Sequence, residues 1–328
     1  MFEYLNTDKI FVQIASYRDC ELQHTLQDLF EKAKKPENIF VGICHQYDMK
    51  NGEDKHLFEI PFPRPNQLRI DEIDYRDAKG ISFARNRAQK LWRGEKWALQ
   101  IDSHSRFKEN WDEELVLAAL NLKSDGNIVF SQGLPPYKKT GEKSEDCSVR
   151  ICCTHFVGTY STPATKEFPP SPNLTIFAYA GFMFGLGENI CQTLINPIFQ
   201  ALDETPISIR LWTKGVDFYA YNKPIIWHYW PSKEEAEKNE ARKKYHLNSI
   251  NKFIKNLHDD LFFIKKSCDE NIVKMNEEYG FFNARTLRDY ERFSGIDFRR
   301  KKLRQFTKLG TYRQWSGVAK TNQIKYLL

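Results

Sequence analysis

Short apolar runs alternate with amphipathic stretches along the first half of the chain. Residues 10–15 (IFVQIA) and 39–44 (IFVGIC) are nearly continuous apolar runs, the pattern of strands that are buried on both faces. Between them, residues 21–34 place apolar side chains at helical spacing, and Pro36 ends that segment. This order of strand, helix and strand is typical of an α/β domain built on a parallel sheet.

The same pattern continues to about residue 230. Further strands are predicted at residues 68–73, 97–101, 128–131, 178–184 and 224–229, and further helices at residues 81–91, 112–122 and 198–212. We expect Ser82 to cap the first of these helices and Pro206 to break the last. Residues 133–148 and 161–173, which are rich in proline and other turn-forming residues, are predicted to be loops.

The sequence changes character near residue 231. Residues 231–328 carry 22 Lys and Arg against 13 Asp and Glu, whereas residues 1–230 carry 27 against 30. Helical spacing of apolar residues continues in this basic part. We therefore expect an α/β domain in residues 1–230 and a mostly helical, basic region in residues 231–328. The excess of positive charge favours an anionic partner.

The overall composition is that of a folded protein from a reducing compartment. Hydrophobic residues make up 41% of the chain and charged residues 28%, which excludes wholesale disorder. The seven cysteines include no CxxC pair, and the adjacent Cys152 and Cys153 cannot easily bridge each other. The first ten residues show no signal-peptide pattern, and no run of about 18 apolar residues occurs. We expect a cytoplasmic protein.

The triplet Asp102-Ser103-His104 is the clearest chemical signal in the chain. It directly follows a predicted buried strand, at the edge where open α/β sheets bind ligands. In an extended segment Asp102 and His104 face the same side, and a carboxylate with an imidazole suits Mn²⁺. Such an ion would neutralise the charge of a departing nucleoside diphosphate. A solvated aspartate followed by a capping serine would give the same triplet.

Several other motifs occur in order around this triplet. They are Ile14-Ala15-Ser16-Tyr17-Arg18-Asp19, Ala78-Lys79-Gly80-x-x-x-Ala84-Arg85, Gln100-Ile101-Asp102-Ser103-His104-x-Arg106-Phe107, Ala180-Gly181-Phe182-x-Phe184, Arg210-Leu211-Trp212-Thr213-x-Gly215-x-Asp217-Phe218 and Arg285-Thr286-Leu287-x-x-Tyr290-x-x-Phe293-x-Gly295. With these motifs, residues 10–298 resemble the polypeptide N-acetylglucosaminyltransferases of glycosyltransferase family 60.

The resemblance implies a GT-A fold, a Rossmann-like nucleotide-sugar-binding domain, with the basic C-terminal region folded back on it. It also implies a metal-dependent, retaining transfer from a UDP-sugar, most often UDP-N-acetylglucosamine, to a hydroxyl acceptor on a protein or glycan. Asp102 and His104 would hold Mn²⁺ or Mg²⁺. His228, at the end of the last predicted strand, would complete the protein ligands. A hydrogen-bonded core histidine is the alternative for His228.

Residues on the loop after the first strand, in the Asp102-Ser103-His104 triplet and in the motifs that contain Lys79, Arg85 and Arg285 are expected to bind the donor. The candidates are Ser16, Tyr17, Arg18, Asp19, Lys79, Arg85, Asp102, Ser103 and Arg285. Tyr17 would stack on uracil, and Asp19 would accept a hydrogen bond from the base or the ribose. Arg85 would reach the diphosphate or the sugar, unless it is only a residue of the helix surface.

Asp203 and Glu204 are the candidate catalytic acids, placed to meet the hydroxyl groups of the sugar or the acceptor. Relatives tend to show Gly-Glu-Glu where this chain has Leu202-Asp203-Glu204, so either acid could point inward. A pair of acids that favours a helix start is the alternative. In the expected mechanism the acceptor attacks from the face that UDP leaves, without an enzyme nucleophile. A double displacement would instead need one of these carboxylates.

The basic tail leaves other roles open. Seven cations and no acid lie from Arg299 to Arg313, with Leu303, Phe306 and Leu309 among them at helical spacing. Such a segment would suit peripheral contact with the inner face of a membrane. It would also suit nucleic acid, but no nucleic-acid-binding motif occurs and we expect no such partner. UDP-galactose, UDP-glucose and UDP-N-acetylgalactosamine are alternative donors, because one or two pocket residues decide the sugar.

Overall fold

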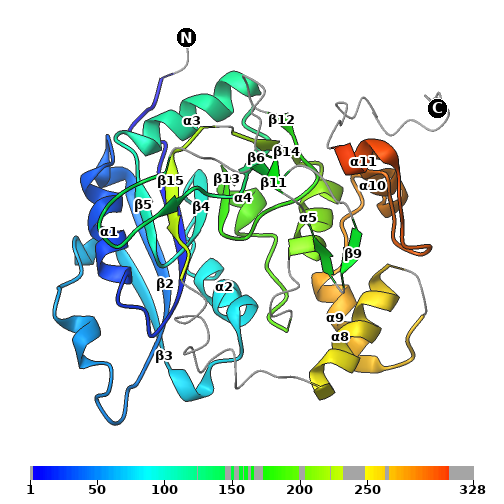
Figure 1. Ribbon diagram of the computed structural model, residues 1–328, viewed down its shortest axis with the longest axis horizontal. Helices are drawn as coiled ribbons and strands as arrows, with labels where there is room; N and C mark the ends of the chain where they lie inside the picture. Colours follow the sequence, from blue (N-terminus) through cyan, green and yellow to red (C-terminus); the bar gives the residue numbers. More distant parts are fainter. Residues whose placement is uncertain are drawn as a thin grey trace.

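A computed structural model of the chain shows a central eight-stranded sheet (Figure 1). The structure describes residues 3–123, 125–144, 149–150, 155–157, 159–161, 164–165, 173–198, 204–221, 223–231, 248–262 and 266–309. The strands of the central sheet are β1 (Ile10–Tyr17), β2 (Ile39–Tyr47), β3 (Leu68–Asp74), β4 (Trp97–Asp102), β6 (Ile128–Ser131), β12 (Asn173–Leu174), β13 (Phe182–Leu186) and β14 (Asp217–Ala220). They lie in the order β12-β14-β6-β13-β4-β1-β2-β3.

The parallel part of this sheet brings several strand ends together. β1 pairs in parallel with both β2 and β4, and β2 pairs in parallel with β3. β13 runs antiparallel between β4 and β6. In this register Asp102 lies opposite Ala15, and His45 lies opposite Ser16. The polar residues at the carboxyl ends of β1, β2 and β4 therefore share one edge of the sheet.

Helices cover both faces of the sheet. The α-helices are α1 (Leu22–Glu31), α2 (Ile81–Gln89), α3 (Trp111–Leu122), α4 (Gly187–Ile190), α5 (Glu204–Thr213), α8 (Asn248–Leu261), α9 (Glu270–Tyr279), α10 (Leu287–Ser294) and α11 (Gln305–Leu309). Short 3₁₀ turns span Pro36–Asn38, Lys55–Phe58, Pro65–Gln67 and Tyr75–Asp77. No helix in the described part of the chain is both long and apolar enough to cross a membrane.

The apolar side chains of β1 alternate between the two faces of the sheet, which explains why helices cover both faces. Ile10, Val12 and Ile14 pack into one apolar cluster with α1 and α3. Phe11 points to the opposite face, in a cluster with α5 and α10, and Ala15 packs there against α2. Successive side chains of a strand face opposite sides, so an uninterrupted apolar run requires helices on both. The predicted α/β architecture is confirmed.

A small second sheet lies next to the end of β4. It contains β5 (Ser105–Phe107), β15 (Ile226–Tyr229) and β7 (Pro136–Tyr137), with β15 antiparallel to β5 and parallel to β7. The remaining strand pairs are β9 (His155–Val157) with β10 (Thr159–Ser161), β8 (Val149–Arg150) with β11 (Ala164–Thr165), and β16 (Ile296–Asp297) with β17 (Lys302–Leu303).

The C-terminal region packs on α5 (Figure 1). Trp212 of α5 stacks on Phe293 of α10, with ring centroids 5.5 Å apart. The hydroxyl of Tyr290, also in α10, donates a hydrogen bond of 2.5 Å to the Ile176 carbonyl. Both aromatic residues of α10 are buried. One apolar cluster therefore includes residues from both sides of position 231. The division of the chain into domains at that position stays a prediction.

Three local expectations were wrong. Gly80 rather than Ser82 precedes the first turn of α2, with a φ of 95° that only glycine adopts readily. Pro206 does not break a helix, because it lies in the first turn of α5, where no intrahelical N–H bond is lost. The predicted 133–148 loop contains the short strand β7. The charged stretch at 232–247 lies outside the described residues.

His45 is a buried histidine in an aromatic environment at the end of β2. The rings of Tyr47, Phe58 and Phe62 lie 4.8, 5.6 and 5.9 Å from its ring. Neither ring nitrogen has a hydrogen-bond partner. Burial lowers the pKa of His45 to about 4. The neutral ring is therefore the form that fits the folded state.

We predict that His45 makes the protein less stable in mild acid. The unfolded state takes up a proton near the ordinary histidine pKa, whereas the folded state does so only near pH 4. Stability is therefore full above about pH 6.5 and lost as the pH falls toward 4, by on the order of 2 kcal/mol at pH 5. His45→Phe should flatten this decline in thermal melts at pH 7.5 to 5. An unchanged slope would contradict the assignment.

Candidate metal centre

Three side chains converge at the carboxyl end of β4. Asp102, His104 and His228 each offer a ligand atom, and these atoms all lie within 4.8 Å of one another. Asp102 is the last residue of β4, and His104 follows two positions later. His228 comes from β15, which pairs with β5 so that His228 lies opposite Ser105. The two imidazole rings are 4.6 Å apart. We call these three residues the triad.

The turn that carries Asp102 and His104 is tied to α1. The Thr25 hydroxyl donates to the Ser103 carbonyl at 2.7 Å and accepts from the Ser105 amide at 2.9 Å. The Ser105 hydroxyl in turn donates to the Asp102 carbonyl at 2.9 Å. Thr25 is fully buried. These bonds satisfy the polar backbone of the turn in the interior and so fix the direction of the two ligand side chains.

Asp19 orients the ring of His104. Its Oδ2 accepts hydrogen bonds from His104 Nδ1 at 2.7 Å and from the Ser103 hydroxyl at 2.5 Å. Burial opposes the charges of both groups, but their mutual attraction lowers the pKa of Asp19 and raises the pKa of His104. A carboxylate can only accept, so the Nδ1 proton is fixed and Nε2 remains for a metal. A metal-binding histidine usually has such a partner.

Arg85 and His228 flank the carboxylate of Asp102. Arg85 Nη2 lies 3.0 Å from Asp102 Oδ1, and His228 Nε2 lies 3.1 Å from Oδ2. Although burial opposes ionisation, Arg85 and the His228 hydrogen bond hold the pKa of Asp102 well below its usual range. For His228, burial outweighs the attraction of Asp102 and lowers the pKa. Asp102 is thus an anion beside a neutral imidazole.

The chemistry of the triad fits a divalent ion. One carboxylate and two imidazoles are a donor set that Mn²⁺ and similar borderline ions accept. His228 Nδ1 is buried and has no hydrogen-bond partner, so this ring has not been fixed by a second polar contact. Asp19 supplies an outer carboxylate for His104, as found around many metal sites. The residues present can therefore hold such an ion.

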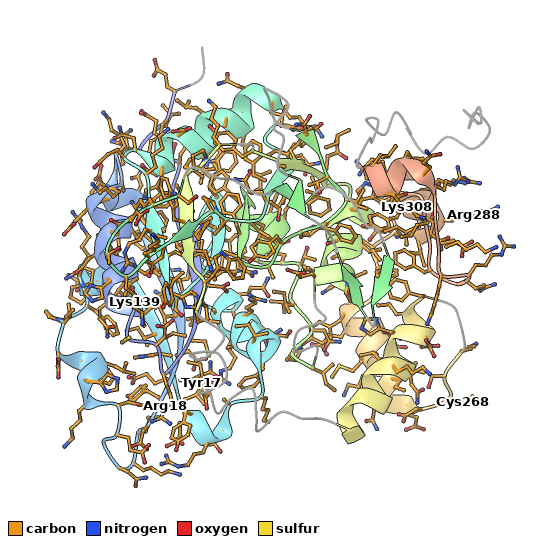
Figure 2. The ribbon with its side chains drawn as sticks, in the orientation of Figure 1. Tyr17, Arg18, Lys139, Cys268, Arg288 and Lys308 are labelled. Carbon is orange, nitrogen blue, oxygen red and sulfur yellow. The ribbon has the colours of Figure 1, made fainter. Side chains whose placement is uncertain are left out.

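The other residues predicted after β1 are held by internal contacts. Arg18 forms ion pairs of 2.9 Å with Asp54 and 3.0 Å with Glu53, and its guanidinium lies 4.2 Å from the Tyr75 ring centre. Tyr17 meets the same ring edge-on at 6.3 Å. Figure 2 shows Tyr17 and Arg18 close together at the lower end of the sheet. Ser16, which precedes them, is fully buried, and its hydroxyl has no partner.

Lys79 and Arg285 are not brought to the triad by any described contact. Lys79 is exposed, and its ammonium lies 5.6 Å from the Phe83 ring centre. Arg285 forms an ion pair of 2.8 Å with Asp217 and donates a hydrogen bond of 2.9 Å to the Gly215 carbonyl. Its guanidinium also lies 4.7 Å from the Trp212 ring centre. The donor-binding roles of both residues stay predictions, and the contacts of Arg285 are those of a structural residue.

The backbone that precedes β13 connects Glu204 with the region of the triad. Its Oε1 accepts a hydrogen bond of 3.2 Å from the Ala180 amide. At the next residue, Gly181, an added Cβ would lie 3.1 Å from Asp102 Oδ2, so this backbone passes directly beside the carboxylate. Asp203 lies outside the described residues. Of the two predicted acids, the structure therefore assigns a position to Glu204 alone.

Two residues of this site were given no role from the sequence. Thr25 was hidden as a polar position on the buried stripe of the helix at 21–34, between Leu22 and Leu29. Gly181 lay within an apolar run that was predicted as strand, whereas β13 begins at Phe182. A polar residue on an otherwise apolar helix face was the available signal for Thr25. Gly181 stood out only as part of the Ala180-Gly181-Phe182-x-Phe184 motif, which does not show that its backbone passes Asp102.

The sequence matches a family model described as "Glycosyltransferase (GlcNAc)" over residues 9–56 and 61–300. No curated protein sequence matches the chain.

Among solved structures, the fold is similar to the crystal structure of GalNAc-T7 with UDP, GalNAc and Mn²⁺, with a TM-score of 0.56 and 12% identity. The match covers 87% of this chain but 56% of that one, so the chain spans little more than half of its length. Staphylococcus aureus TarS 1–349 in complex with UDP-GlcNAc matches with a TM-score of 0.49 and 13% identity, covering 83% of this chain and 70% of that one. The GalNAc-T7 likeness supports the GT-A type of fold.

We predict that Mn²⁺ stabilises the protein through the triad. At about 100 times its Kd, the ion should raise the Tm by about 4 °C. His228→Ala or Asp102→Asn should abolish the shift, and Asp19→Asn should weaken Mn²⁺ binding by about 10-fold to 100-fold because His104 loses its orientation. His24→Ala, at an exposed position of α1, is the matched control. Full shifts in the triad variants would exclude a metal site here.

A second prediction separates structure from donor binding at Arg285. Arg285→Ala should lower the free energy of unfolding by about 2 kcal/mol, since it removes the main ion pair of the largely buried Asp217. The Kd for UDP should stay unchanged once the protein is folded. Arg288→Ala, at an exposed position nearby, should leave the stability unaffected. A weaker affinity for UDP at unchanged Tm would instead assign Arg285 to the donor.

Proposed function

The chain belongs to the glycosyltransferase (GlcNAc) family, and on that premise we propose that it transfers N-acetylglucosamine from UDP-N-acetylglucosamine to a hydroxyl group of a protein or glycan. We further propose that the transfer retains the configuration of the sugar. The observation that carries this proposal is the triad, an ionised carboxylate and two imidazoles at the carboxyl edge of a mainly parallel sheet.

A divalent ion on the triad would neutralise charge on the donor diphosphate as UDP leaves. Arg85 would assist, because its guanidinium is already placed beside Asp102 with only about a tenth of the side chain exposed. Its pairing with Asp102 keeps the carboxylate ionised. Asp19 would hold the His104 ring in one orientation throughout.

The base and ribose would bind beyond Asp19. Tyr17 and Tyr75 offer aromatic rings at the end of β1, and Arg18 lies on the Tyr75 ring. Because Arg18 is already paired with Asp54 and Glu53, we assign it to shaping this surface and Tyr17 to stacking on uracil. Ser16, whose buried hydroxyl has no hydrogen-bond partner, would lie beneath this surface and support it.

Glu204 would bind the hydroxyl groups of the transferred sugar. Its carboxylate is anchored by the Ala180 amide, next to the backbone that passes Asp102. In the proposed reaction the acceptor oxygen forms a bond to the anomeric carbon while the bond to the UDP oxygen breaks. The electron pair of that bond leaves with UDP, and the acceptor proton passes to a phosphate oxygen. Glu204 positions the sugar and forms no covalent bond.

The proposal predicts metal-dependent release of UDP from UDP-N-acetylglucosamine, slow with water and faster with an acceptor. Asp102→Asn and His104→Ala should lower the rate by more than about 100-fold, because donor charge is no longer neutralised. His24→Ala should be active. The measurement is UDP formation with Mn²⁺ and with EDTA, over a panel of UDP-sugars. Activity that survives EDTA would refute the metal dependence. A preference for another UDP-hexose would refute the proposed donor.

Glu204→Gln distinguishes the two retaining mechanisms. An amide keeps the hydrogen-bonding oxygen but is a poor nucleophile, so a positioning role predicts partial activity with a raised KM for the donor. A glycosyl adduct on Glu204, detected by mass spectrometry of the wild-type protein, would show a double displacement instead.

A further inference from the structure

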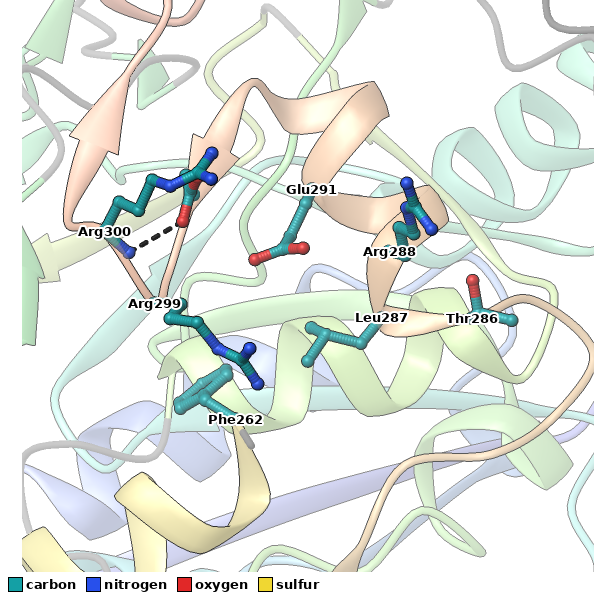
Figure 3. A pocket seen from close by; sticks show the side chains of 8 residues that line it. Phe262, Thr286, Leu287, Arg288, Glu291, Arg299 and Arg300 are labelled. Carbon is teal, nitrogen blue, oxygen red and sulfur yellow. Dashed lines mark hydrogen bonds and ion pairs between the residues drawn. The ribbon is translucent and has the colours of Figure 1, made fainter. Parts of the chain in front are cut away.

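A cavity of about 490 Å³ lies in the C-terminal region, away from the triad (Figure 3). It is an open hollow between the end of α8, α10 and the turn between β16 and β17. The residues that line it are Phe262, Thr286, Leu287, Arg288, Glu291, Asp297, Arg299 and Arg300. Its volume falls within the range of roughly 300–1,000 Å³ that is usual for ligand pockets. None of its lining residues takes part in the proposed reaction.

The apolar wall of the cavity is firmly held. The Phe262 ring stacks on Phe298 with a centroid distance of 4.5 Å, and Phe298 is buried in the core shared with α5. α10 begins with a reciprocal cap between Thr286 and Asp289. It ends at Gly295, which has a φ of 70°. The cavity is therefore framed by packed and capped elements.

The charged groups of the cavity are unequal in number. Three arginines and two acids line it, and the Arg300 guanidinium lies 3.5 Å from Asp297. Glu291 Oε1 accepts the Phe298 amide at 3.1 Å. Burial raises the pKa of Glu291 and outweighs the Phe298 hydrogen bond and the nearby arginines, which lower it. The cavity therefore carries one more guanidinium group than carboxylates.

Arg288 is the clearest available cation. It is exposed on α10 and makes no ion pair among the residues that the structure describes. Figure 2 shows Arg288 and Lys308 projecting from the same side of the molecule, and Figure 3 shows Arg299 extending from the turn toward Phe262. Beyond the cavity, Lys301, Lys302 and Arg304 add positive charge. An approaching anion would therefore be attracted over some distance and then meet guanidinium groups.

We propose that this cavity, which we call the arginine pocket, binds an acidic polypeptide segment in which a carboxylate is followed by an apolar side chain. Guanidinium groups hold carboxylates with two parallel hydrogen bonds, and Leu287, which is only partly buried, would contact the apolar neighbour. This inference does not depend on the proposed function, because the pocket shares no residue with the triad.

The same features disfavour other polyanions. Two acids inside the pocket would repel the closely spaced phosphates of a nucleic acid or an anionic membrane more strongly than they repel a single carboxylate. Phe262 is 4% exposed, so it offers no open ring face for stacking a base. The pocket is concave, so its apolar wall cannot insert into a bilayer.

The test is the binding of a short fluorescein-labelled peptide in which Glu alternates with Phe and Ser, measured by anisotropy on the full chain. Arg288→Gln and Arg299→Gln should each raise the Kd about tenfold. Lys308→Gln removes the same charge outside the pocket and should change the Kd less than about twofold. Glu291→Gln keeps the acceptor for the Phe298 amide but removes a like charge, so it should tighten binding.

Several results would overturn the proposal. One is the absence of peptide binding, and another is an equal effect of Arg288→Gln and Lys308→Gln, which would indicate unspecific charge attraction. A third is stronger competition by phosphatidylglycerol vesicles or by single-stranded DNA than by unlabelled peptide, which would assign the surface to a membrane or to nucleic acid. Thermal melts of each variant keep loss of folding apart from loss of binding. UDP release, measured separately, should be unchanged in all four variants.

Discussion

The partly buried negative charge of Asp102 is the constraint around which the rest of the site is arranged. An unpaired carboxylate at the end of a buried strand would be costly, and here one oxygen meets Arg85 while the other meets His228. These partners come from α2 and from β15, so the charge can be balanced only when the sheet, α2 and the small second sheet have assembled. The close passage of Gly181 leaves no side chain to compete for the same oxygen.

A second layer of contacts links this charge to the start of the chain. Asp19 holds His104 and Ser103, and Thr25 holds the backbone on both sides of the triplet. Both residues lie close after β1, on the loop and on the first helix. The chain therefore uses one short N-terminal segment twice, to cover the sheet with apolar side chains and to orient polar groups at its edge. In this segment the residues that pack the core and the residues that orient the site belong to the same elements.

Periodicity was enough to predict the architecture, because continuous apolar runs such as residues 10–15 must be covered on both faces. The Asp102-Ser103-His104 triplet could be recognised for a related reason, since it directly follows such a run. The pairing of β15 with β5 could not be predicted, because β5 has only three residues and no periodic pattern. This pairing nevertheless brings His228 to Asp102. The partners of Arg285 were also hidden, since a single sequence does not show which acid an arginine will meet.

The shared core beneath α10 has a consequence for the history of the chain. Trp212 is covered by Tyr290 and Phe293, and the hydroxyl of Tyr290 reaches back to the backbone at Ile176. A fragment that ends near residue 230 would expose this indole and its apolar neighbours to water. Loss of α10 would therefore uncover an apolar face of α5. A substitution on the face of α5 that packs against α10 changes the surface that α10 must cover. We therefore expect residues of the two helices to change together during evolution.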